Sequence, residues 1–191
     1  MSNGVNELIT EIDKDMIKRL IFDWDATLTL WEGLPIWQPE YLSKYIQNIT
    51  PEDNLENRLK KYISMIETET MISNFGDENK ILKFMYLLFG EDRFLLLRRL
   101  FQLCDSKIPI IVLTNSGIYI TLLQLYKNYD LEYKSRFELK NSLFHDILRY
   151  VADLENLNVR VITGYRYTEF PATGTPDKTT KIKRILLEDK D

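Results

Sequence analysis

Three short apolar runs constrain the fold of this chain most strongly. They occupy residues 20–22, 108–113 and 159–164, and polar or glycine residues follow each run at once. The first two runs are apolar on both faces and all three contain β-branched side chains, which is typical of strands buried in a parallel sheet. Segments with helical patterning separate the runs, among them residues 118–129 and 142–156, and another over 175–191 follows the third run, so the sequence predicts an α/β fold. The loops that follow the strands should converge at one edge, where such sheets bind ligands.

The long segment between the first two runs has a different pattern. Residues 31–104 contain no convincing strand and predict several helices, over 38–49, 77–90 and 91–104, with one more that starts at Pro51 and has Thr50 as its N-cap. An insertion directly after the first strand would form a lid over the strand ends. The predicted division is therefore a core of residues 1–30 and 105–191 and a helical cap of residues 31–104.

The amino-acid composition limits the kinds of partner that the protein is expected to bind and the cellular compartment in which it is expected to work. The net charge of -4 gives no general electrostatic reason to bind nucleic acid. One cysteine, Cys104, and one histidine, His145, cannot supply a closed zinc site, and both are predicted to be packing residues. The first twenty residues mix acidic, basic and apolar side chains, unlike a signal peptide or a membrane span. A reducing, cytoplasmic location without membrane contact is expected.

Two carboxylates, Asp23 and Asp25, end the first strand in the stretch FDWDAT. Successive side chains of a strand alternate between its faces, so both acids are predicted to point the same way while Trp24 points into packing on the other side. Two adjacent carboxylates recruit a cation or raise one pKa. One carboxylate can then attack phosphorus while its protonated neighbour donates to the leaving oxygen, and Mg²⁺ offsets the approach of two anions. The alternative is a strand-end turn in which the two acids merely cap the segment that follows.

Other predicted site residues follow the later strands. Thr114 and Asn115 are predicted to form a cluster of hydrogen-bond donors suited to phosphate oxygens. The alternative is that these residues only cap the helix that follows. Lys178, just before the final predicted helix, would neutralise the charge of a phosphate group. The alternative is an ordinary surface lysine without a role in binding, because most lysines are exposed. Arg166, in the loop after the third strand, is a candidate for gripping a second anionic group of a substrate, and an exposed loop arginine is its alternative.

The order of these motifs resembles that of the haloacid dehalogenase-like (HAD) superfamily. The stretch DWDAT resembles its D-x-D-x-T first motif, VLTNS its second, and TPDKTTKIKRIL its third, a lysine just before a helix. The resemblance covers most of residues 19–187. It implies a three-layer Rossmann-like core with a parallel sheet, an inserted all-helical C1-type cap, and phosphatase activity that depends on Mg²⁺.

The resemblance also implies roles for particular residues. Asp23 would be the nucleophile that forms an aspartyl phosphate, and Asp25 the general acid and base. Both would bind Mg²⁺, Asp25 through its main-chain carbonyl. Thr114 and Lys178 would hold the phosphoryl group. The cap would shape the choice of a small phosphorylated substrate.

The chain departs from the family pattern after Lys178. The family has a fourth motif, a further strand that ends in an acidic pair and completes the magnesium site, and no such strand follows here. The chain is shortened, its metal binding is weakened, or the stretch RILLED is itself a strand that brings Glu188 and Asp189 to the metal. The last alternative leaves a short connection for a crossover, so we favour the first two.

Three functions follow as expectations. The first is a magnesium-dependent phosphohydrolase acting on a small phosphomonoester. The second is a catalytically impaired HAD-like protein that binds a ligand or a protein partner. The third is a phosphotransferase or mutase whose closed cap excludes water.

Overall fold

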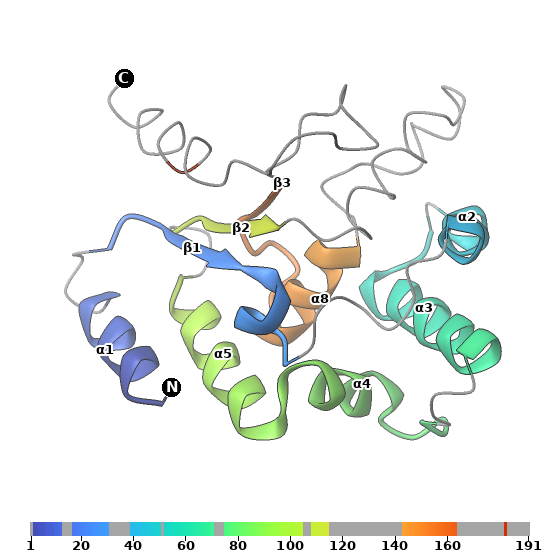
Figure 1. Cartoon of the computed structure of the whole chain (residues 1–191), viewed down its shortest axis with the longest axis horizontal. Coiled ribbons are helices and arrows are strands. Elements are labelled where there is room, and N and C mark those ends of the chain that lie inside the picture. The colour runs from blue at the N-terminus through green and yellow to red at the C-terminus, as the bar shows by residue number, and fades with distance from the viewer. Residues whose placement is uncertain are drawn as a thin grey trace.

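The computed structural model describes eight parts of the chain, and every structural statement below concerns them. They are residues 2–12, 17–30, 39–50, 52–70, 75–104, 108–114, 143–163 and 182. Within them a small parallel sheet is joined to a larger set of helices (Figure 1). The fold is therefore mixed α/β and helix-rich, as the sequence predicts.

The sheet contains β1 (Leu20–Asp23), β2 (Ile110–Thr114) and β3 (Val159–Thr163), side by side in that order. Both pairs are parallel, with Leu20 opposite Ile110 and Ile110 opposite Val159. The predicted strands and their parallel arrangement are thus confirmed. Their carboxyl ends lie at one edge of the sheet, which is where the ligand site is predicted to lie.

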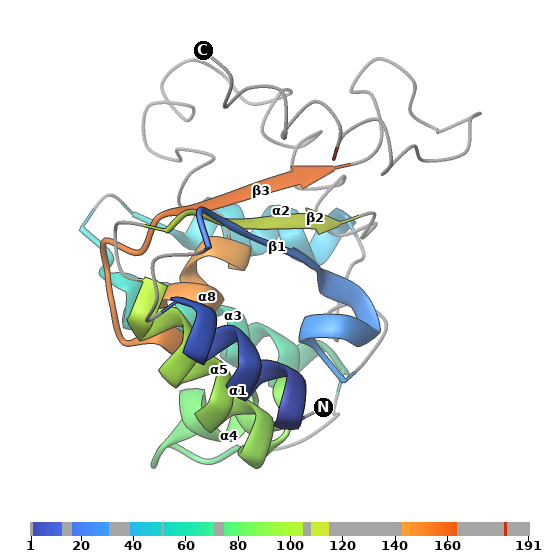
Figure 2. The same cartoon turned by 90° about the vertical axis from the view of Figure 1, so that its left-hand side faces the viewer.

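The described helices agree with most of the predicted ones. They are α1 (Ser2–Ile12), the π-helical turn η1 (Trp24–Leu28), α2 (Pro39–Asn48), α3 (Leu55–Thr70), α4 (Lys80–Phe89), α5 (Glu91–Cys104) and α8 (Leu143–Ala152). Figure 2 shows α1, α5 and α8 on one face of the sheet. The helices predicted over 118–129 and 175–191 lie outside the described residues, apart from residue 182.

The predicted start of α3 is wrong. Thr50 does not cap a helix that begins at Pro51; its backbone N–H donates to Asp53 Oδ2 at 2.7 Å. The helix begins at Leu55, and Asn54 accepts a hydrogen bond from the Asn57 backbone N–H at 2.9 Å. The Asn54 carbonyl also accepts from the Arg58 N–H at 3.1 Å, so Asn54 is the N-cap that starts the helix, while Asp53 binds the Thr50 N–H before it.

One hydrophobic core joins the helices to the sheet. Phe22 meets Phe101 of α5 edge to face, with ring centroids 6.0 Å apart. Val112 and residues of α3, α4, α5 and α8 belong to the same buried cluster. The cluster therefore spans both sides of the predicted boundary between core and cap, and the division into two domains stays a prediction.

The junction between α4 and α5 requires a glycine. Gly90 has a φ of 78° and closes α4 with a hydrogen bond from its N–H to the Tyr86 carbonyl at 2.8 Å. A Cβ at this position would lie 3.2 Å from Leu30 Cδ1. The Leu30 N–H also donates to the Leu88 carbonyl at 2.7 Å, so the chain leaving η1 is held against this junction.

Two residues expected to be packing residues are buried. Burial raises the pKa of the Cys104 thiol to about 11, so it is unreactive at neutral pH. His145 is also buried, and burial lowers its pKa to about 4. Across the described part of the chain, no helix combines the length and apolar composition that a membrane crossing needs.

Candidate active site

The chain turns sharply where β1 ends. The strand stops at Asp23, and residues Trp24–Leu28 form a single turn of π-helix. Strand alternation therefore ends at Asp23, and the alternation predicted through Asp25 is wrong. The direction in which the Asp25 side chain points stays a prediction. Single π-helical turns are rare and occur frequently at functional sites.

Asp23 occupies the junction between the strand and the turn. Its backbone is extended, with φ -80° and ψ 148°, and its side chain is half-buried. Its Oδ1 accepts a hydrogen bond from the Trp24 backbone N–H at 2.9 Å. The carboxylate thus caps the first orphan donor of the turn, which fixes its orientation at the edge of the sheet.

Trp24 anchors the start of the turn. Its side chain is fully buried and meets the ring of Phe144 on α8 edge to face, with centroids 4.6 Å apart. A second edge-to-face contact reaches Phe89 of α4, at 6.4 Å. The prediction that Trp24 points into packing is confirmed. These contacts of Trp24 with α8 and α4 hold in place the backbone that carries Asp23 and Asp25.

The other end of the turn is held by hydrogen bonds. The Trp24 carbonyl accepts from the Thr29 backbone N–H and from its hydroxyl, both at 3.1 Å. Arg93 of α5 directs Nη1 at the carbonyls of Thr27 and Thr29, at 3.1 and 3.4 Å. A cation at the carbonyl end of a helical turn is favourable because carbonyl dipoles converge there. Sequence reasoning missed Arg93, since nothing local links it to residues more than sixty positions earlier.

Thr114 ends the neighbouring strand. Asp23 pairs with Leu113, so Thr114 lies one residue farther along β2, where it pairs with Thr163. It is fully buried. Paired residues of parallel strands share a face and successive residues alternate, so the side chains of Asp23 and Thr114 leave the sheet on opposite faces. A ligand that contacts both must therefore lie beyond the strand ends.

The remaining predicted site residues cannot be placed beside these two. The side chain of Asp25, together with Asn115, Arg166 and Lys178, lies outside the described residues. Among the side chains that are described, no group of three metal-binding residues gathers at one point. Of the predicted residues, the structure brings Asp23 and Thr114 to the same edge.

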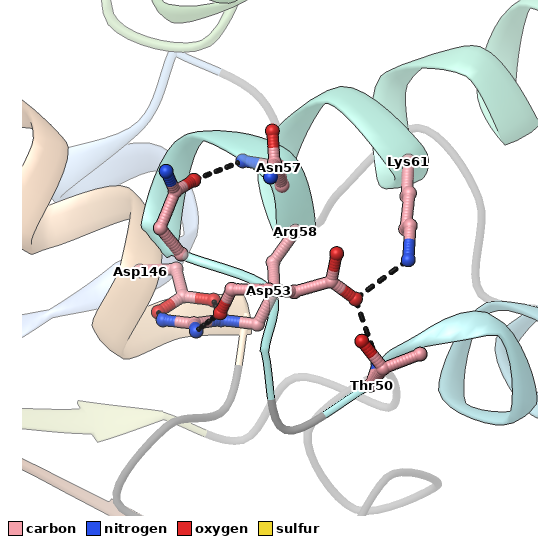
Figure 3. A network of polar contacts seen from close by, with 7 residues as sticks. Thr50, Asp53, Asn57, Arg58, Lys61 and Asp146 are labelled. Atoms are coloured by element: carbon pink, nitrogen blue, oxygen red, sulfur yellow. Dashed lines mark hydrogen bonds and ion pairs between the residues drawn. The ribbon is translucent and has the colours of Figure 1, made fainter.

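A second polar cluster lies between α3 and α8 (Figure 3). Arg58 donates through Nε and Nη2 to the two carboxylate oxygens of Asp146, each at 2.7 Å. Its Nη1 also donates to the Asp53 carbonyl at 2.6 Å. The Asp146 side chain is fully buried, while that of Arg58 is 15% exposed. Sequence reasoning missed this pair, whose members stand 88 residues apart.

Burial and pairing act in opposite directions on this pair. Burial raises the pKa of Asp146, and the hydrogen bonds from Arg58 oppose that rise. The same hydrogen bonds raise the pKa of Arg58. A bidentate guanidinium–carboxylate pair supplies both groups with the hydrogen bonds that water would otherwise make. The Asp146 carboxylate is therefore occupied by Arg58 of the same chain.

Comparison with known proteins adds no relative to this description. No family model, no curated protein and no solved structure matches the chain.

Proposed function

We propose that the chain is a HAD-like phosphohydrolase that cleaves small phosphomonoesters through an aspartyl phosphate on Asp23. The observation that carries the proposal is the position of Asp23, half-buried at the carboxyl end of β1 where the chain enters a π-helical turn. Thr114 ends the adjacent parallel strand at the same edge. Parallel sheets bind their ligands at this edge.

In the first half-reaction, a carboxylate oxygen of Asp23 attacks phosphorus in line with the ester oxygen. The new bond joins that carboxylate oxygen to phosphorus as the bond from phosphorus to the ester oxygen breaks. Asp25 gives its proton to the departing oxygen, which leaves as an alcohol. The hydrogen bond from the Trp24 N–H to Asp23 Oδ1 holds the attacking group in place.

In the second half-reaction, Asp25 is a carboxylate and removes a proton from water. The water oxygen bonds to phosphorus while the bond between phosphorus and the Asp23 oxygen breaks. Inorganic phosphate leaves, and both acids return to their starting states. Thr114, Asn115 and Lys178 supply donors to the phosphoryl oxygens, and Arg166 pairs with a second anionic group of the substrate.

The donor set fits Mg²⁺ in type. This ion is usually bound by one or two carboxylates together with waters and substrate phosphates. Asp23 places a carboxylate at the strand end, and the Asp25 main chain follows within the same turn. These two residues would hold the ion, which supplies positive charge that offsets repulsion between the phosphate and the carboxylates.

The test is hydrolysis of an aryl phosphate with and without Mg²⁺, by the wild type, Asp23→Asn and a control, Asp92→Asn. Asp92 is an exposed acid in the first turn of α5. The proposal expects turnover that requires Mg²⁺, survives in the control and is lost in Asp23→Asn. A wild-type rate equal to the blank would contradict it and favour a ligand- or protein-binding module. Labelled phosphate that stays on the protein or passes to an alcohol instead of water would indicate a phosphotransferase.

We also place the protein in the cytoplasm. The single cysteine of the sequence is buried in α5 and serves packing, which is compatible with a reducing compartment. Detection of the protein in cytosolic extract after cell fractionation would support this location, and recovery in a secreted fraction would contradict it.

A further inference from the structure

One short segment of the helical region contacts the turn that follows Asp23 at both of its ends. The segment is residues 88–93, which end α4, pass through Gly90 and begin α5. We call it the α4–α5 junction. It lies far from β1 in the sequence, yet Figure 1 shows it close to η1, the turn at the end of that strand.

The contacts between the junction and the turn are of three kinds. The Phe89 ring packs against the Trp24 ring at the start of the turn, with centroids 6.4 Å apart. Arg93 directs Nη1 at two carbonyls near the end of the turn, at 3.1 and 3.5 Å. The Leu88 carbonyl accepts a hydrogen bond from the N–H of Leu30, just beyond the turn, at 2.7 Å. The same few residues therefore hold the turn from its beginning to its exit.

Gly90 allows a close approach of the two segments. Its φ of 78° and ψ of 146° are a backbone conformation that side chains other than hydrogen disfavour. Among the residues that the structure describes, Leu30 Cδ1 is the atom that a Cβ here would meet, at 3.2 Å. Non-bonded carbon atoms prefer separations of about 3.5–4.0 Å. A methyl group at Gly90 would therefore displace Leu30 by a few tenths of an ångström.

A displacement of Leu30 reaches Asp23 through a short series of hydrogen bonds. Thr29, directly before Leu30, donates from its backbone N–H and its hydroxyl to the Trp24 carbonyl, each at 3.1 Å. The Trp24 N–H donates in turn to Asp23 Oδ1 at 2.9 Å. Thr29 and Trp24 are fully buried, and closely packed interiors transmit strain because they leave little space to absorb it.

We propose that Gly90 and Leu30 are positioning residues for the nucleophile. Their contact keeps the turn, and with it the Asp23 carboxylate, in the orientation that attack on phosphorus requires. This inference rests on the proposed function, because it assigns the junction an effect on attack by Asp23. A misplacement of about 1 Å can reduce a rate about a hundredfold, so a few tenths of an ångström correspond to a severalfold loss of kcat.

The first experiment compares Gly90→Ala with Gly76→Ala in the hydrolysis of para-nitrophenyl phosphate with Mg²⁺. Gly76 also has a positive φ, of 64°, so alanine strains the backbone at both positions, but a Cβ there would lie 4.0 Å from Lys83 Nζ, an ordinary contact. We expect Gly90→Ala to lower kcat at least about threefold with little change in KM, and Gly76→Ala to keep the wild-type kcat. Equal kcat values in the two variants would overturn the proposal.

Truncation of Leu30 tests the same contact without straining the backbone. Leu30→Ala should lower kcat, whereas Leu95→Ala, whose side chain is equally exposed at 52%, should leave it unchanged. Leu30→Ala also removes the atom that a methyl group at Gly90 would meet. The double variant Leu30→Ala/Gly90→Ala should therefore keep the kcat of Leu30→Ala. Losses that simply multiply, or equal kcat values in Leu30→Ala and Leu95→Ala, would contradict the proposal.

Tryptophan fluorescence gives a reading that does not need turnover. In a Trp31→Phe/Trp37→Phe background, Trp24 is the single tryptophan of the chain. Gly90→Ala should alter the emission of Trp24 because the Trp24 carbonyl is tied to the residue that moves, and Gly76→Ala should not. Identical emission in the two glycine variants would overturn the proposed effect of the junction on the turn.

The two proposals fail in different ways. If the wild type hydrolyses no phosphate ester, the function proposed for Asp23 is wrong, and the catalytic part of this inference is wrong with it. If the wild type is active and Gly90→Ala matches Gly76→Ala in kcat, the function stands and the positioning role is wrong.

Discussion

Two aspartates of this protein show how tertiary surroundings assign a role to the same side chain. Asp146 is fully buried between α8 and α3, where Arg58 holds both its carboxylate oxygens. Asp23 is half-buried at the end of β1, where a backbone N–H orients one oxygen. The first acid is enclosed by the protein and the second stands at the edge where parallel sheets bind ligands. We infer that Asp146 serves stability and Asp23 serves chemistry.

The largest expected effect concerns catalysis. Asp23→Asn removes the proposed nucleophile and should reduce kcat for an aryl phosphate about ten-thousandfold or more, since loss of a catalytic nucleophile typically has effects of this size. The free energy of unfolding should change by no more than about 1 kcal/mol, because the Trp24 N–H keeps an amide oxygen as acceptor. Steady-state kinetics and urea denaturation measure the two quantities. If the Asp23→Asn variant keeps its activity, Asp23 has no catalytic role and does not differ from Asp146 in the way proposed.

The second effect concerns stability alone. Asp146→Asn removes the charge opposite Arg58 and should lower the free energy of unfolding by about 3–5 kcal/mol, as for other broken buried pairs. Glu56→Gln is the matched control: it removes the acid of an exposed pair and should change stability by less than about 1 kcal/mol. Urea denaturation measures both.

A double variant sharpens the second prediction. Arg58→Met/Asp146→Leu replaces both charges by apolar groups and should recover much of the lost stability, because neither Arg58 nor Asp146 is then left as a buried charge without the other. If Asp146→Asn is no less stable than Glu56→Gln, the structural role of this pair is wrong.

The third effect is a pH dependence near the buried pair. Burial holds the pKa of His145 at about 4, below its ordinary value of 6.5. The unfolded chain therefore binds this proton more readily, and the free energy of unfolding falls as the pH drops through this window. Between pH 7 and pH 5 the loss is about 2 kcal/mol. His145→Gln should flatten the pH profile by this amount in urea denaturation. An identical profile in the variant and the wild type would show that His145 does not cause it.

The smallest effect concerns the turn beside Asp23. Arg93→Gln weakens the hydrogen bonds to the turn's carbonyls and should cost about 1 kcal/mol of stability. Because the turn positions the acids, kcat should fall severalfold with little change in KM. Arg99→Gln, an exposed arginine on the same helix, is the control. Equal kcat values in the two variants would contradict a positioning role for Arg93.

Local patterns were enough to predict the sheet and most of its helices. Short runs rich in apolar and β-branched side chains identify β1, β2 and β3, and β2, buried at every position, is apolar up to Thr114 because both its faces are covered. Gly90 marks the end of α4, since it adopts a backbone conformation that other residues rarely adopt. The start of α3 was misplaced because Thr50, Asp53 and Asn54 are all good capping residues, and only their competing hydrogen bonds select Leu55 as the first residue.

The sequence by itself determined that two acids follow the first strand and that Trp24 packs inward. Only the tertiary structure decided that the chain forms a π-helical turn at this point, and that Arg93 holds it. The partnership of Arg58 with Asp146 was likewise decided by packing of α3 against α8. The physical reason is that strands and helices follow from short-range periodicity, whereas a side chain's partners follow from which distant elements the shared hydrophobic core brings together.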